Sequence, residues 1–100
     1  MLSIYKYELS RRSGRQDIEL PQGCRILTMQ AQYDKLCLWA VVNPQASLVK
    51  YRFYKLYTGD PFEHVPGEFV GTAQFDGGKQ VVHVFRARLV ETFSGTFVEV

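Results

Sequence analysis

The sequence predicts an all-β, mainly antiparallel protein, a small single-domain sandwich or partly open barrel of roughly six to eight strands. Three observations support this class. Val, Ile and Thr together with Phe, Tyr and Trp supply about a third of the 100 residues, and these side chains suit a pleated, half-buried surface. No segment carries the capped apolar stripe that is typical of an amphipathic helix. Short apolar-rich runs alternate with Gly, Pro, Asn and Asp, which favour turns.

Seven segments have the composition of strands, and each is followed by a polar or turn-forming stretch. They are Ser3–Leu9, Gln16–Leu20, Arg25–Tyr33, Leu36–Asn43, Val49–Tyr57, Phe69–Phe75 and Gln80–Leu89. The segment Pro61–Pro66 leaves room for one short helix. Residues 1–89 therefore form the expected β domain. Residues 90–100 form a β-prone extension, which we expect to add to a sheet edge in the same chain or on a neighbouring subunit.

Length and charge exclude several classes of protein. A chain of 100 residues allows one domain with one core, and a net charge of +2 is too small to indicate nucleic-acid binding by itself. No apolar run approaches the roughly 18 residues that a membrane span needs, and Met1–Leu9 alternates polar and apolar residues, unlike a signal peptide. Cys24 and Cys37 form no CxxC motif and fit two free thiols in a reducing compartment. We therefore expect a cytoplasmic domain without a membrane segment.

The hairpin at Tyr33-Asp34-Lys35-Leu36 decides which face carries the only tryptophan. If Tyr33 pairs with Leu36, one face is wholly apolar, with Ala31 opposite Leu38, Met29 opposite Ala40 and Leu27 opposite Val42. The other face is mixed, with Thr28 opposite Val41, Gln30 opposite Trp39 and Gln32 opposite Cys37. An indole ring beside amide groups suits a planar polar ligand or a protein partner. The alternative is that another part of the chain covers Trp39.

A second hairpin, closed at Gly77-Gly78, places His83. It puts Phe75 opposite Gln80, Ala73 opposite Val82, Thr72 opposite His83 and Gly71 opposite Val84. His83 then shares a face with Val81, Phe85 and Ala87. Such a histidine is either a hydrogen-bonded core residue or one wall of a polar notch formed with Thr72 and Gln74.

The residue patterns of common enzymes are missing from the sequence. His64 and His83 do not have metal-ligand spacing, and no Gly-rich phosphate loop or GxSxG motif is present. The sequence therefore predicts no enzyme activity, no cofactor and no metal site.

Groups suited to binding gather in three basic clusters and one loop. The clusters are Arg11 with Arg12 and Arg15; Lys50, Arg52 and Lys55 among Tyr51, Phe53, Tyr54 and Tyr57; and Arg86 with Arg88. Basic residues between aromatic ones suit single-stranded nucleic acid or a phosphorylated small molecule, or else form a solvated strand face above a core. The segment Tyr57-Thr58-Gly59-Asp60-Pro61 is either a binding loop or a plain turn.

Several segments, in the same order along the chain, carry a resemblance to a known group of proteins. They are Ile4–Tyr7, Ile18–Gly23, Arg25–Gln32, Leu38–Pro44 (LWAVVNP), Thr58–Pro61 (TGDP), Phe69–Gln74 and His83–Phe85. Together they resemble small phage and prophage proteins of unknown function. The likeness spans residues 4–86 and departs at Asp60, where that family tends to have His.

The resemblance implies a phage or prophage origin and action in the bacterial host cytoplasm. We expect a non-catalytic binding protein that forms a homo-oligomer and counters host defence by sequestering a nucleotide-like immune signal. The candidate ligand-binding residues are Gln30, Trp39, Arg52, Tyr57, Thr58, Gly59, Asp60 and His83. One alternative is a phage structural or protein-interaction module that inhibits a host factor. A second, less favoured, is binding of single-stranded nucleic acid.

Overall fold

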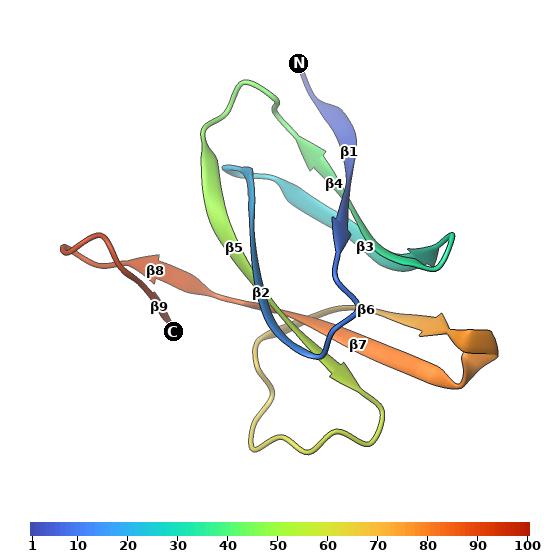
Figure 1. Cartoon of the computed structure of the whole chain (residues 1–100). Coiled ribbons are helices and arrows are strands. Elements are labelled where there is room, and N and C mark those ends of the chain that lie inside the picture. Colours follow the sequence, from blue (N-terminus) through green and yellow to red (C-terminus); the bar gives the residue numbers. More distant parts are fainter.

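Nine strands in three antiparallel sheets, one 3-10 turn and no α-helix make up the structure, a computed structural model that describes residues 1–100 (Figure 1). In chain order these are β1 (Ser3–Leu9), β2 (Gly14–Pro21), β3 (Arg25–Gln32), β4 (Lys35–Val42), β5 (Leu48–Tyr57), β6 (Glu68–Phe75), η1 (Asp76–Gly78), β7 (Gln80–Ala87), β8 (Leu89–Glu91) and β9 (Phe97–Glu99). No helix is long and apolar enough to cross a membrane. The predicted all-β antiparallel class is confirmed.

Two larger sheets pack face to face and enclose the core. Sheet A has the order β1-β4-β3, and sheet B has the order β2-β5-β7-β6. Sheet A contributes Leu9, Met29, Leu36 and Leu38 to the core, and sheet B contributes Leu20, Tyr51, Phe53, Ala73, Phe75, Val82 and Val84. These residues alternate along their strands with outward-facing ones, as the two-residue period of a strand requires.

The sandwich is nearly closed along both sides. On one side the chain passes from β1 in sheet A directly into β2 in sheet B. On the other side β6 packs against β3, and a Cβ added to Gly71 would lie 2.9 Å from the backbone oxygen of Met29. Gly71 is therefore the residue that lets the two sheet edges approach so closely. The result lies between the predicted sandwich and the predicted partly open barrel.

The register predicted for the first hairpin is wrong by two residues. Gln32 pairs with Lys35, so that Tyr33 and Asp34 form the turn, with φ of 49° and 63°. Positive φ at both central residues matches the twist of the strands, and Asp tolerates that conformation. A two-residue shift keeps every side chain on its predicted face. However, Trp39 now lies opposite Thr28 instead of Gln30.

A bulge also alters the predicted core face of this hairpin. The register shifts between Ile26 and Thr28, and Leu27 is 46% exposed although the sequence placed it in the core. Ala31 is likewise exposed. By contrast, the second hairpin has the predicted register, including Thr72 opposite His83. The segment Pro61–Pro66 contains no helix.

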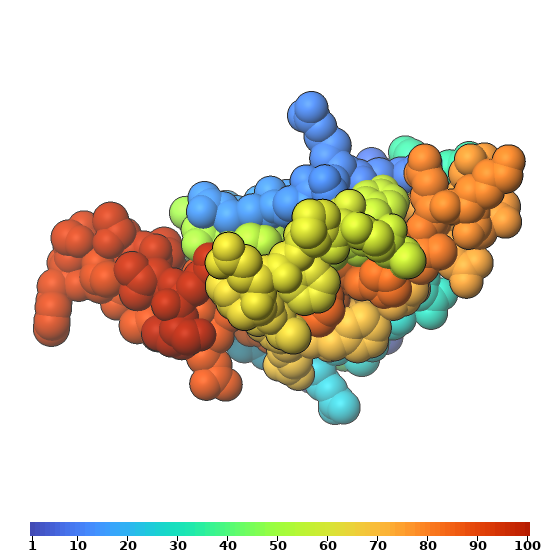
Figure 2. All heavy atoms as spheres, turned by 90° about the horizontal axis from the view of Figure 1, so that it is seen from below, coloured from blue at the N-terminus to red at the C-terminus, as the bar shows by residue number.

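A long loop and the C-terminal hairpin lie beside the outer face of sheet B. The loop, residues 58–67, packs beside Tyr54 and Leu56 of β5, with Phe62, Glu63, His64 and Pro66 facing the hollow between them. Strands β8 and β9 pair only with each other and form a lobe at one side of the molecule (red in Figure 2). The predicted addition of the β-prone extension to a sheet edge of the same chain is not found, because β8 and β9 form a separate two-stranded sheet.

Candidate functional site

The predicted ligand-binding residues fall into three separate places. Gln30 and Trp39 lie on the outer face of sheet A, where Trp39 is half-buried between Thr28 of β3 and Lys6 of β1. The Gln30 amide donates to the Thr28 hydroxyl at 3.3 Å, and Lys6 donates to Gln32 at 2.9 Å. This face is mixed, as the sequence predicted, and its polar groups already bond to one another.

Arg52 lies on the outer face of sheet B, where it joins the C-terminal hairpin to the sheet. Arg52 as a residue is 7% exposed, and its guanidinium donates to both carboxylate oxygens of Asp17, at 2.9 and 3.2 Å. It also donates to Glu99 at 3.3 Å, and the Tyr54 hydroxyl donates to the same Glu99 oxygen. The Arg52 hydrogen bonds hold the pKa of Asp17 below its ordinary value of 3.8. Arg52 is thus fully engaged within the chain.

Replacing Glu99 with alanine should loosen the C-terminal hairpin without unfolding the sandwich. The substitution removes the only carboxylate through which β9 reaches Arg52 and Tyr54. We expect the backbone amides of β8 and β9 to exchange hydrogen about fivefold faster, in line with about 1 kcal/mol for a half-exposed ion pair. Hydrogen exchange by NMR measures this, with the exposed Glu91 in β8 replaced by alanine as a control. If the amides of β8 and β9 exchanged equally fast in the Glu99 and Glu91 variants, the contact of Glu99 with Arg52 and Tyr54 would be contradicted.

Tyr57, Thr58, Gly59, Asp60 and His83 do come together, at the end of β5. Asp60 accepts a hydrogen bond from the Tyr57 amide at 2.8 Å, which closes a tight turn. Both ring nitrogens of His83 are engaged, with the Thr72 hydroxyl at 3.0 Å and the Thr58 hydroxyl at 2.9 Å. The side chains of Thr58, Asp60 and His83 therefore stabilise the turn, and none of the five residues lines the hollows beside β3, β6, the 58–67 loop or the β1–β2 connection.

The basic and aromatic strip of β5 is largely buried. Tyr51, Arg52, Phe53 and Lys55 are buried, and only Lys50 among the basic residues of this strand projects into solvent. Nucleic acid cannot stack on rings that lie in a core. Strand β5 therefore does not offer the binding surface that its sequence suggested.

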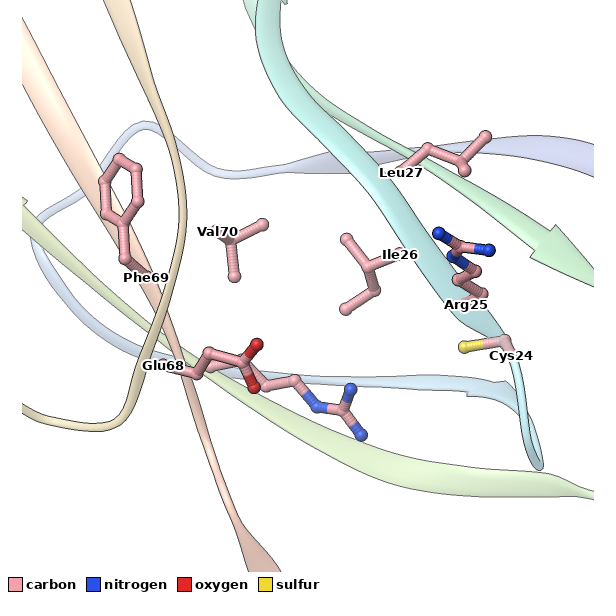
Figure 3. A pocket seen from close by; sticks show the side chains of 8 residues that line it. Cys24, Arg25, Ile26, Leu27, Glu68, Phe69 and Val70 are labelled. Carbon is pink, nitrogen blue, oxygen red and sulfur yellow. The ribbon is translucent and has the colours of Figure 1, made fainter.

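A groove of about 470 Å³ opens at one end of the sandwich, between β3 and β6 (Figure 3). Its lining consists of Cys24, Arg25, Ile26, Leu27, Glu68, Phe69, Val70 and Arg86. Figure 3 shows Ile26 and Val70 facing each other across the space, with the Cys24 thiol pointing into it. Phe69 is 57% exposed and Leu27 is 46% exposed, so the rim of the groove presents uncovered apolar surface.

Two β-bulges shape this end of the groove. One lies at Leu27 in β3, and the other lies at Val70 in β6. A bulge bends its strand and redirects a side chain. The two edges that touch at Gly71 and Met29 therefore diverge toward Cys24 and Glu68, which leaves the groove between them.

Two guanidinium groups, Arg25 and Arg86, line the groove together with one carboxylate, Glu68. Arg25 and Arg86 form no ion pair, and the Arg86 guanidinium stacks 4.5 Å from the ring centre of Tyr51. The pKa of Tyr51 is raised above its ordinary value, mainly by burial and secondly by the neighbouring Cys24 thiol. A second hollow of about 630 Å³ continues past Glu68 and Arg86 to Arg88. The groove thus joins apolar surface to the guanidinium groups of Arg25 and Arg86, and the adjoining hollow adds that of Arg88.

Sequence reasoning missed most of this groove. It singled out Arg86 and Arg88, but it did not connect them with residues 24–27 or 68–70. These segments meet only because β3 and β6 lie at adjoining edges of different sheets. The sequence gives no signal of the groove at Leu27 or Phe69, because the exposure of these two apolar residues is known only from the structure.

Cysteine and metal chemistry add little to the groove. Both cysteines are free: Cys24 is half-buried at the groove, and Cys37 is buried in β4. No group of three or more His, Cys, Asp or Glu side chains is arranged to hold a metal ion.

Comparison with known proteins places the chain in a family but offers no characterised relative. No curated protein matches the chain, and no solved structure matches it. A family model described as "Domain of unknown function (DUF7352)" matches residues 1–92, which include all of sheets A and B. The chain therefore belongs to this family of domains of unknown function.

Proposed function

We propose that the protein is a non-catalytic binding protein whose ligand is a small nucleotide-like molecule held in the groove between β3 and β6. The observation that carries the proposal is that exposed apolar side chains share one hollow with two guanidinium groups that form no ion pair. Its volume of about 470 Å³ falls within the roughly 300–1,000 Å³ of small-molecule sites.

Each part of such a ligand has a matching group in the groove. Phe69, Leu27 and Val70 offer a planar base or ring apolar surface. Arg25 and Arg86 suit phosphate oxygens, which guanidinium groups bind through two parallel hydrogen bonds. The carboxylate of Glu68 can accept hydrogen bonds from ribose hydroxyls. The groove therefore suits a phosphorylated, partly apolar molecule better than a peptide or a purely ionic ligand.

The resemblance to phage and prophage proteins supplies the biological setting of the proposal. A phage protein that binds a nucleotide-like molecule in the bacterial cytoplasm would lower the concentration of a host-derived immune signal. Counter-defence by sequestration is therefore the role that we propose. A homodimer would carry two such grooves, each with the same lining residues.

Calorimetric titration against a panel of cyclic and ADP-ribose-type nucleotides tests the binding function. We expect one member of the panel to bind in the micromolar range or tighter, and Arg25→Gln to weaken it about tenfold. Arg25 is exposed and unpaired, so its replacement should not affect folding. Lys6→Gln, which removes the same charge beside Trp39, is the matched control and should bind normally. If no nucleotide of the panel bound at high micromolar concentration, the proposal would be wrong.

Docking of a host protein on the outer face of sheet A is a second candidate function. This face carries Ile4, which is 59% exposed, beside half-buried Trp39 and Val41. Apolar residues ringed by polar ones are typical of a protein-interaction surface. A pull-down from host lysate with wild-type protein and Trp39→Ala would favour this candidate if one stoichiometric partner depended on Trp39.

A further inference from the structure

A second polar cleft lies at the opposite end of β2 from the groove. It is lined by Ser10, Arg12, Ser13, Arg15, Gln16 and Lys55, and by no hydrophobic residue. Ser10, Arg12 and Ser13 belong to the connection between β1 and β2, Arg15 and Gln16 to β2, and Lys55 to β5. This basic cleft has a volume of about 670 Å³.

The floor of the basic cleft is a buried ammonium group without a negative partner. Lys55 is 1% exposed, and its Nζ donates to the Ser10 carbonyl and hydroxyl at 2.8 Å and to Gln16 Oε1 at 2.7 Å. All three acceptors are neutral, and none of the four ion pairs of the protein involves Lys55. Desolvation lowers the pKa of Lys55 below its ordinary value. Burying a charge without a counter-charge is costly, and an apolar side chain would fill this inward position without that cost.

The rest of the lining consists mainly of hydrogen-bond donors. The Arg12 guanidinium has no partner, and Arg15 lies 3.8 Å from an Asp17 oxygen that already bonds Arg52. The Ser13 hydroxyl is free, and Gln16 uses its oxygen for Lys55 and for the Ser10 amide, which leaves its NH₂ to donate. The lining of the cleft therefore contains three positively charged side chains and several hydrogen-bond donors, and it includes no carboxylate.

From this arrangement we propose that the basic cleft is a binding site for a phosphoryl group, as inorganic phosphate or as a small phosphate monoester. Arg12 and Arg15 contact the phosphate oxygens directly, since guanidinium groups match that geometry. Lys55 keeps its three hydrogen bonds and supplies fixed positive charge beneath the anion. No ring lines the cleft, so a base would find no stacking partner there. This site is independent of the proposed nucleotide groove.

Titration of the full-length protein with inorganic phosphate, in a phosphate-free buffer and followed by amide NMR, tests the proposal. We expect saturable shifts confined to residues 10–16 and to Lys55, with half-saturation below about 10 mM. Glycerol 3-phosphate forms the second arm, and tighter binding of either compound identifies a free anion or a monoester as the preferred form.

Three variants make the test specific. Arg12→Gln should weaken phosphate binding about fivefold or more, whereas Lys79→Gln, an exposed charge outside the cleft, should change it less than about twofold. Lys55→Met should abolish binding if it folds, and if it does not fold, Arg12→Gln decides alone. Equal weakening by Arg12→Gln and Lys79→Gln, or absence of saturable shifts, would overturn the proposal. So would a cleft that binds a single-stranded oligonucleotide but neither phosphate compound.

Discussion

Replacing Gly67 with alanine is expected to lower the free energy of unfolding by about 2–5 kcal/mol. Gly67 has φ of 130°, and a Cβ there would lie 2.2 Å from the backbone oxygen of Arg86. Backbone atoms cannot rotate away as a side chain can, so β6 would have to separate from β7 where Glu68 pairs with Arg86. Denaturant unfolding followed by tryptophan fluorescence measures the loss.

A substitution at a second glycine distinguishes the cost of steric overlap from the cost of backbone strain. Gly59 also has a positive φ, of 98°, but a Cβ there would meet no atom within 4 Å. Gly59→Ala should therefore cost only the conformational strain, about 1–2 kcal/mol. If both variants lost the same stability, the close approach of Gly67 to Arg86 would not be present in solution.

Replacing Asp17 with asparagine should destabilise the protein by about 3 kcal/mol at neutral pH. The substitution removes the carboxylate that accepts two hydrogen bonds from the buried Arg52 and leaves Glu99 as its only counter-charge. A buried guanidinium left with one partly exposed counter-charge accounts for most of the expected loss. Glu19→Gln is the matched control, because Glu19 is exposed on the same strand and forms no ion pair.

The same pair gives a defined acid dependence. Because the pKa of Asp17 is lowered in the folded protein, its stabilising effect is fully present above its ordinary value of 3.8. The effect is lost as the pH falls through the lower, folded value. Wild type and Asp17→Asn should therefore differ most near pH 7 and converge in strong acid. A stability difference that stayed constant with pH would contradict an ionised Asp17–Arg52 pair.

The strands could be predicted because their signals are local. Alternation and turn residues placed the seven strands of sheets A and B to within two residues at every end, and Gly77-Gly78 fixed the register of the second hairpin. The first hairpin lacks such a glycine pair. There, Tyr33 and Asp34 take positive φ, which no strong sequence signal indicates. A shift by two residues left the same side chains facing the core, so the apolar pattern could not detect it.

The candidate sites could not be predicted, because they depend on contacts between distant segments. In the sequence, Arg52 looks like a strand residue with a free side chain. In the structure it bonds to Asp17 and Glu99, which lie 35 and 47 positions away. Lys55 follows the alternation of core residues, yet it is charged, and only the Ser10 and Gln16 acceptors explain its burial. The groove needs two bulges and the meeting of two sheet edges. None of these features leaves a periodic pattern in the sequence.

Mapping the amide shifts caused by the tightest-binding nucleotide would test the binding function most directly. If the nucleotide occupies the groove, the amides of residues 24–27, 68–70 and 86 shift together and saturate at one ligand per chain. Shifts centred on Trp39 and Thr28, or no saturable shifts, would contradict a nucleotide site between β3 and β6.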